Sequence, residues 1–213
     1  YRLPNNTYLF NSRFKQNAIK FSSSYRYKNW QNIFRYQLHT EVTGIPGHVH
    51  GDPSEVDIAE ITSSEVNLST DFKPTRPTQF VNNQLFIYES NYMTDNFKFE
   101  FYAGHFINNL TEYEKWTRPA FDLNLSNTLL SPSIRYMSNK LTLHLGSQLI
   151  FQKNKNNVND RLVPDASSFN LGPYILIEYD KDNFGINSGV RYDYKILTSN
   201  DQVLDIDYEN PFK

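Results

Sequence analysis

Residues 169–197 carry the feature that most restricts the fold, a pair of alternating runs joined by a short polar turn. Before the turn, the odd-numbered positions from Phe169 to Tyr179 are apolar or aromatic, and the pattern resumes at Phe184 after it. Apart from Leu176, the positions between them are polar, small or charged. Alternation with a period of two predicts a β-hairpin with one apolar face and one polar face.

Two kinds of protein contain such a hairpin. In the wall of a transmembrane β-barrel, the apolar side chains face lipid and the polar side chains face the lumen. In a soluble antiparallel sheet or sandwich, the apolar face packs against a core and the other face meets water. The hairpin alone is consistent with both.

The same alternation predicts further strands along the chain, nine or ten in all. They lie at about residues 7–14, 18–27, 30–41, 80–92, 97–110, 121–136 and 141–151, with a last candidate near 204–208. Pro132 interrupts one of them, and the apolar positions change parity there, which predicts a β-bulge. Ten apolar residues share one parity relative to the turns, and we expect them on a common outer surface. These are Phe97, Phe99, Phe101, Leu141, Leu143, Leu145, Ile175, Ile177, Ile186 and Val190.

The connections between these strands are of two kinds. Four are tight, at residues 28–29, 93–96, 137–140 and 180–183, and each contains an Asn suited to a left-handed or turn conformation. The connections that alternate with these tight turns, at 43–77, 111–120, 153–168 and 198–202, are longer and polar. Bacterial outer-membrane barrels have short periplasmic turns and long extracellular loops. We therefore predict an all-β fold, an antiparallel up-and-down transmembrane β-barrel segment.

Composition agrees with this prediction. Aromatic residues make up 15% of the chain, and they favour both strands and membrane interfaces. The net charge of -2 indicates no nucleic-acid partner, and the absence of cysteine excludes a disulfide framework. No run approaches the length of a membrane-spanning helix. The sequence contains no nucleophile elbow, phosphate-binding glycine loop or HExxH pattern, so we expect neither an enzyme nor a cofactor.

Five short motifs, in this order and spacing, resemble the barrel of TonB-dependent outer-membrane receptors of the Bacteroidetes type. They are GIPGHVH at residues 44–50, RPTQ at 76–79, GSQLIFQKN around Gln148, LVPD at 162–165 and GVRYD at 189–193. The resemblance extends over about residues 5–194. It implies a location in the bacterial outer membrane and the import of a scarce nutrient such as an iron chelate or a vitamin.

The resemblance also implies a barrel of about 22 strands with a plug in its lumen. At about 9 to 11 residues per strand, 213 residues cannot build it. We therefore expect residues 1–213 to form a partial barrel without a plug domain or TonB box. The implied partners are outer-membrane lipid, a plug and further strands outside this chain, TonB acting through that plug, and a surface lipoprotein or other complex subunits. Two alternatives remain, an independent small barrel with a structural or adhesive role and a soluble β-sandwich binding module.

Candidate site residues fall into two groups. The loop at residues 43–77 is predicted to be extracellular and to bind or gate the ligand, and its distinctive residues are Gly44, Pro46, Gly47, His48, His50 and Asp52. His48 and His50, two residues apart and followed by Asp52, suggest a transition-metal site, although free loop histidines are commoner. The second group, Glu100, Glu178, Arg191 and Asp193, is predicted to face the lumen, either to contact a plug or substrate or as a charge ladder in the polar wall.

Overall fold

The computed structural model describes residues 8–9, 12–45, 62–63, 77–114, 118–158, 163–181 and 183–199. All regular structure in these residues is β-strand, and the pairing is antiparallel throughout, so the predicted all-β, up-and-down architecture is confirmed. In this part of the chain, no helix is long and apolar enough to cross a bilayer.

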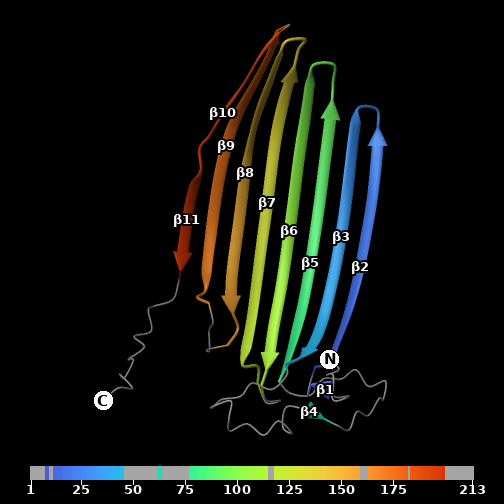
Figure 1. Ribbon diagram of the computed structural model, residues 1–213, viewed down its shortest axis with the longest axis vertical. Helices are drawn as coiled ribbons and strands as arrows, with labels where there is room; N and C mark the ends of the chain where they lie inside the picture. The colour runs from blue at the N-terminus through green and yellow to red at the C-terminus, as the bar shows by residue number, and fades with distance from the viewer. Residues whose placement is uncertain are drawn as a thin grey trace, which may run out of the picture.

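A sheet of nine strands contains most of the chain (Figure 1). Its strands are β2 (Phe14–Tyr27), β3 (Trp30–Gly44), β5 (Thr78–Met93), β6 (Phe97–Tyr113), β7 (Phe121–Met137), β8 (Leu141–Asn156), β9 (Ala166–Lys181), β10 (Phe184–Arg191) and β11 (Tyr194–Ser199). Successive strands of this sheet are paired from β2 at one edge to β10 at the other, and β11 pairs with β9 on the same edge as β10. Figure 1 shows the tight turns together at one end of the sheet, and the strand ends that lead into the longer connections lie at the opposite end.

The predicted strand at residues 7–14 is wrong. Two short strands, β1 (Tyr8–Leu9) and β4 (Thr62–Ser63), pair in a separate small sheet, while the nine-stranded sheet begins at Phe14. The turn expected between residues 14 and 18 is absent, because Phe14 to Asn17 continue β2 and pair with Thr43 to Thr40. The candidate strand at 204–208 lies outside the described residues.

The predicted bulge at Pro132 is also wrong. Leu130 lies opposite Leu149, and Ser133 lies opposite Gly146, so two residues on each strand separate the two pairs and none is inserted. On its other side, Pro132 stays in register with Phe101. Proline has no N–H to donate, so it interrupts the β7–β8 ladder without changing the register.

A proline explains the division between β10 and β11 in the same way. Both strands pair with β9 in one continuous register, because Val190 lies opposite Ile175 and Tyr194 opposite Leu171. Between these pairs, Tyr192 N donates to Pro173 O at 3.1 Å. Pro173 has no N–H with which to return the bond. The hairpin predicted at residues 169–197 is therefore one long pair of strands.

Two of the tight turns contain the same hydrogen bond, from a backbone N–H to a Thr or Ser hydroxyl three residues earlier. Phe97 N donates to Thr94 Oγ1 at 3.0 Å, and Leu141 N donates to Ser138 Oγ at 3.1 Å. In a third turn, Lys28 adopts a left-handed φ of 51°. Asn29, Asn96 and Asn139 lie in the turns as expected, but they do not adopt the left-handed conformation, because Lys28 is the only non-glycine residue with positive φ in the described chain.

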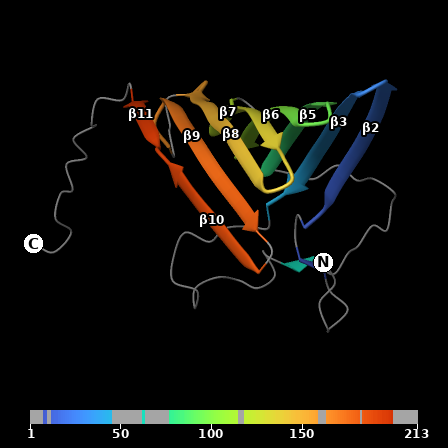
Figure 2. The ribbon, with the colours of Figure 1, turned by 90° about the horizontal axis from the view of Figure 1, so that it is seen from above.

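The sheet is curved and open. Seen from above, β2 lies well apart from β10 and β11 (Figure 2), and the described residues contain no pairing between these two edges. The strands of this sheet from β2 to β9 have 14 to 17 residues, longer than the 9 to 11 that a membrane-spanning strand needs. Phe121 is the only buried hydrophobic residue of the described chain. The sheet therefore has two broad uncovered faces rather than a packed core.

Candidate functional site

The strand register assigns every side chain to one of two faces. Residues directly opposite each other in antiparallel strands lie on the same face. Leu145 lies opposite Ile134 and Ile175. From these residues the row continues across the sheet on the same face. Toward the β2 edge it contains Phe99, Tyr92, Trp30 and Tyr27, and toward the β10 edge it contains Val190. We call the face that holds Leu145 the apolar face and the one that holds His144 the polar face.

The apolar face has a band without ionised residues. Between the row of Leu141 and the row of Phe151, no Asp, Glu, Lys or Arg of the described chain falls on it. The ten apolar residues expected on one surface all lie on this face, as predicted. Many large side chains are open to solvent, among them Leu145, with 40% of its surface exposed, and Val190, with 67%.

The height of this charge-free band can be worked out from the sequence. Ten residue steps separate Leu141 from Phe151 on β8. At about 3.4 Å per residue the band is about 34 Å long, and at a strand tilt of about 40° it would cover about 26 Å along a barrel axis. The apolar band of outer-membrane barrels is about 25 Å high.

Several polar side chains within the band are paired across strands, whereas the buried Ser147 Oγ has no hydrogen-bond partner among the described residues. Tyr88 Oη donates to Asn32 Oδ1 at 2.8 Å, and Trp30 Nε1 donates to Ser90 Oγ at 2.7 Å. His105 Nδ1 is 2.8 Å from Thr128 Oγ1 on the neighbouring strand. Each of these pairs lowers the cost of leaving a polar group in an apolar environment.

The polar face carries ion pairs at similar heights across the sheet. Glu100 accepts from Lys98 at 2.7 Å and lies 3.9 Å from Arg135. On the same face, nearer to the β2 edge of the sheet, Arg35 pairs with Glu89. Along β6, the aromatic residues at 97, 99 and 101 are exposed, whereas the polar residues at 98, 100 and 102 are partly covered. On β6, the face with the charges is therefore the more enclosed one.

Glycines on the polar face leave room for side chains to lie flat. A Cβ on Gly146 would meet the ring of Tyr174 at 2.4 Å, and the hydroxyl of Tyr174 lies 3.4 Å from His144 Nε2. A Cβ on Gly172 would meet the Arg191 guanidinium at 2.3 Å. The polar face thus holds an ordered set of charged and aromatic groups above small residues.

The four residues expected to face a lumen all lie on the polar face. Arg191 donates to Asp193 at 2.8 Å through Nε and to Gln148 at 2.9 Å through Nη1. Glu100 belongs to the ion-pair group described above, and Glu178 lies opposite Thr142. The structure thus brings Arg191 and Asp193 together, and it gives Glu100 different partners. Their lumen-facing role remains a prediction.

Of the six candidate loop residues, the structure describes only the first, Gly44. Gly44 is the buried last residue of β3, paired with Thr78. Pro46, Gly47, His48, His50 and Asp52 lie outside the described residues. Within the described ranges, no three His, Asp or Glu side chains converge as metal ligands would. The metal site at His48 and His50 remains a prediction.

Sequence reasoning missed several groups of the polar face. The contact of His144 with Tyr174 and the pairs Arg35–Glu89 and Arg135–Glu100 depend on which residues face each other across strands. The tight turns carried a usable signal, because a short turn fixes the register of its two strands. Counting outward from residues 138–140 places Arg135 opposite His144.

Comparison with known protein families and with curated proteins finds no match to this sequence. The functional argument therefore depends on the two faces of the sheet and on the sequence motifs.

Proposed function

We propose that this chain forms part of the wall of an outer-membrane β-barrel, with the apolar face toward lipid and the polar face toward the lumen. The observation that carries the proposal is the charge-free band. A surface of exposed Phe, Leu, Ile and Tyr side chains about 26 Å high is costly in water, and it suits the hydrocarbon core of a bilayer. Tyr27, Trp30, Tyr92 and Tyr136 near the tight turns suit a membrane interface.

A soluble β-sandwich explains the same residues less well. Its apolar face would pack against a second sheet about 10 Å away. In the described part of the chain, the only other sheet is the two-residue pair of β1 and β4, and the apolar side chains of the nine-stranded sheet remain exposed.

An independent small barrel requires its first and last strands to pair. Among the described residues, β2 and β10 are at opposite edges, and both leave a row of backbone groups without a strand partner. Unpaired edges are strongly disfavoured in a bilayer, because no water satisfies their N–H and C=O groups. Further strands on both sides would satisfy them, which favours a wall segment of a larger barrel.

We further propose that this barrel is a TonB-dependent receptor that imports a scarce nutrient, such as an iron chelate or a vitamin. The support is the order of the five sequence motifs together with a polar face on which several charges form ion pairs. Such a face can line a lumen and contact a plug domain through the groups around Glu100 and Arg191. The tight turns would be periplasmic, and the longer connections, including residues 45–77, would be extracellular.

Cysteine labelling tests the membrane proposal, because this chain contains no native cysteine. Leu145→Cys lies on the apolar face, and Ser133→Cys lies on the polar face, opposite Gly146 on the neighbouring strand. In intact outer membranes of cells that express the full-length protein, a water-soluble maleimide should label Ser133→Cys and leave Leu145→Cys unlabelled. Denaturation should allow both to react. Equal labelling of the two sites before denaturation would overturn the proposal.

The transport proposal has its own test. Cells that lack the gene should lose growth on one or more scarce nutrients in a panel of iron chelates and vitamins, and the intact gene should restore it. Uptake should also stop when the proton-motive force is collapsed. Uptake that persists without that force would contradict a TonB-dependent mechanism, and it would leave the barrel proposal standing.

A further inference from the structure

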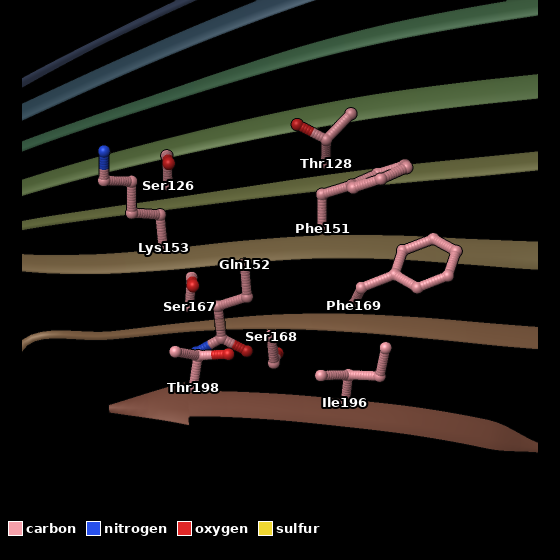
Figure 3. A pocket seen from close by; sticks show the side chains of 10 residues that line it. All are labelled: Ser126, Thr128, Phe151, Gln152, Lys153, Ser167, Ser168, Phe169, Ile196 and Thr198. Carbon is pink, nitrogen blue, oxygen red and sulfur yellow. The ribbon is translucent and has the colours of Figure 1, made fainter. Parts of the chain in front are cut away.

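A shallow groove crosses the apolar face where the charge-free band ends on the side of the longer connections. It is formed by β7, β8, β9 and β11 and has a volume of about 370 Å³. Figure 3 shows that its large apolar side chains lie at one end, together with Thr128, and that its lysine lies at the other. Phe151, Phe169 and Ile196 lie at one end, and Lys153, Ser167 and Thr198 lie at the other, with Gln152 and Ser168 pointing to the opposite face by strand alternation.

The apolar end of the groove continues the band. The rings of Phe151 and Phe169 are 5.0 Å apart between centroids, and Ile196 lies opposite Phe169 on the next strand. Phe151 and Ile196 are each 45% exposed. These three side chains therefore present an open hydrocarbon surface at the last row before the charges begin.

The polar end carries an unpaired positive charge. Lys153 is the first ionised residue of β8 beyond the band on this face, and Lys155 follows it. Both are exposed, and neither forms an ion pair within the described residues. The carboxylates nearest in the register belong to Asp122 and Asp165, and both already accept bonds from Asn side chains, at 3.1 and 2.7 Å. Hydroxyls of Ser126, Ser167 and Thr198 complete this end.

We propose that this groove binds one anionic lipid, with its phosphate beside Lys153 and the hydroxyls and an acyl chain along Phe151, Phe169 and Ile196. The inference depends on the proposed membrane location of the sheet. Charge complementarity selects the phosphate, since an unpaired ammonium and neutral hydroxyl donors face it. The aromatic and aliphatic floor selects a lipid over a free phosphate ion, because a free ion gains nothing from hydrocarbon.

Native mass spectrometry of the full-length protein tests the proposal. The protein is released from nanodiscs that contain phosphatidylcholine and phosphatidylglycerol with identical acyl chains, and the bound lipids are counted. Lys153→Gln should remove one retained phosphatidylglycerol and lower the affinity of that site about fivefold. Lys181→Gln is the matched control, because Lys181 lies on the same face at the opposite end of β9 and should change nothing at this site.

Two further measurements separate the contribution of the acyl chain to binding from that of the phosphate. Ile196→Ser should weaken retention of phosphatidylglycerol while the charge is unchanged. Inorganic phosphate at millimolar concentration should fail to displace the lipid from the wild-type protein. Displacement by phosphate would overturn the proposal in favour of a free anion site, and equal lipid retention by the wild type and Lys153→Gln would overturn it outright.

The cysteine labelling described above keeps this test separate from the membrane proposal. If Leu145→Cys is protected but Lys153→Gln has no effect, only the lipid site fails. If Leu145→Cys reacts freely in intact membranes, the membrane location fails, and the lipid site fails with it.

Discussion

Leu145→Arg would put a guanidinium close to the middle of the charge-free band. Leu145 lies between Ile134 and Ile175 on the apolar face, about midway between the rows of Leu141 and Phe151. An Arg on the lipid side of an outer-membrane barrel costs about 2–4 kcal/mol at the midplane. We therefore expect this substitution to lower the free energy of unfolding by about 2–4 kcal/mol.

Two other substitutions on β8 separate membrane depth from simple damage. Leu141→Arg lies on the same face at the rim of the band, where an Arg costs about 0–1 kcal/mol. Thr142→Arg lies on the polar face opposite Glu178, so the new cation faces a carboxylate across the strands. We expect Thr142→Arg to change the free energy of unfolding by less than about 0.5 kcal/mol.

The measurement is reversible unfolding of the full-length protein in phospholipid vesicles with increasing guanidinium chloride. Tryptophan fluorescence and the gel mobility of the unheated protein follow the transition, and linear extrapolation gives the free energy of unfolding in water. If Leu145→Arg and Leu141→Arg cost the same, depth in a bilayer does not explain the band. A cost for Thr142→Arg equal to that for Leu145→Arg would refute the assignment of the two faces.

Three further substitutions test local features by the same unfolding measurement. Lys28→Gly should raise stability by about 0.5–1 kcal/mol, because glycine adopts the φ of 51° without strain, and a loss would contradict that turn geometry. Gly146→Ala should lower stability by about 1 kcal/mol, because its Cβ displaces the ring of Tyr174, whereas a gain would show that the ring moves freely. Tyr88→Phe should cost about 1–2 kcal/mol by leaving Asn32 Oδ1 without its donor, and adding Asn32→Val should recover most of it; additive losses would exclude that pairing.

The parity of the side chains could be predicted from the sequence. Alternation is a local property of the strand, so the residues from Phe97 to Phe101 and from Leu141 to Leu145 were assigned to one face without knowledge of their neighbours. The tight turns were also recognisable, because Asn, Asp and Ser residues between two alternating runs favour turns. These two features were enough to predict an antiparallel sheet with one apolar face.

Two structural predictions were wrong because the same local sequence pattern is compatible with more than one structure. Pro132 was expected to shift the register, but it omits only the hydrogen bonds that its nitrogen cannot donate, and the flanking pairs hold the strand in place. Alternation at residues 7–14 suggested a strand of the main sheet, whereas Tyr8 pairs with Ser63 in a separate small sheet. Strand propensity indicates that a segment will be extended, but not which partner it will choose.

The sequence by itself determined the two faces of each strand and the positions of the tight turns, because both depend on residues close together in the chain. Only the tertiary structure decided which residues face each other, including Glu100 with Arg135 and His144 with Tyr174. It also decided that the nine strands form one open sheet with the apolar face uncovered, and that Lys153 ends up beside Phe151, Phe169 and Ile196. The physical reason is that pairing between strands joins residues far apart in the chain, and its register depends on turn geometry and backbone hydrogen bonds along the whole strand.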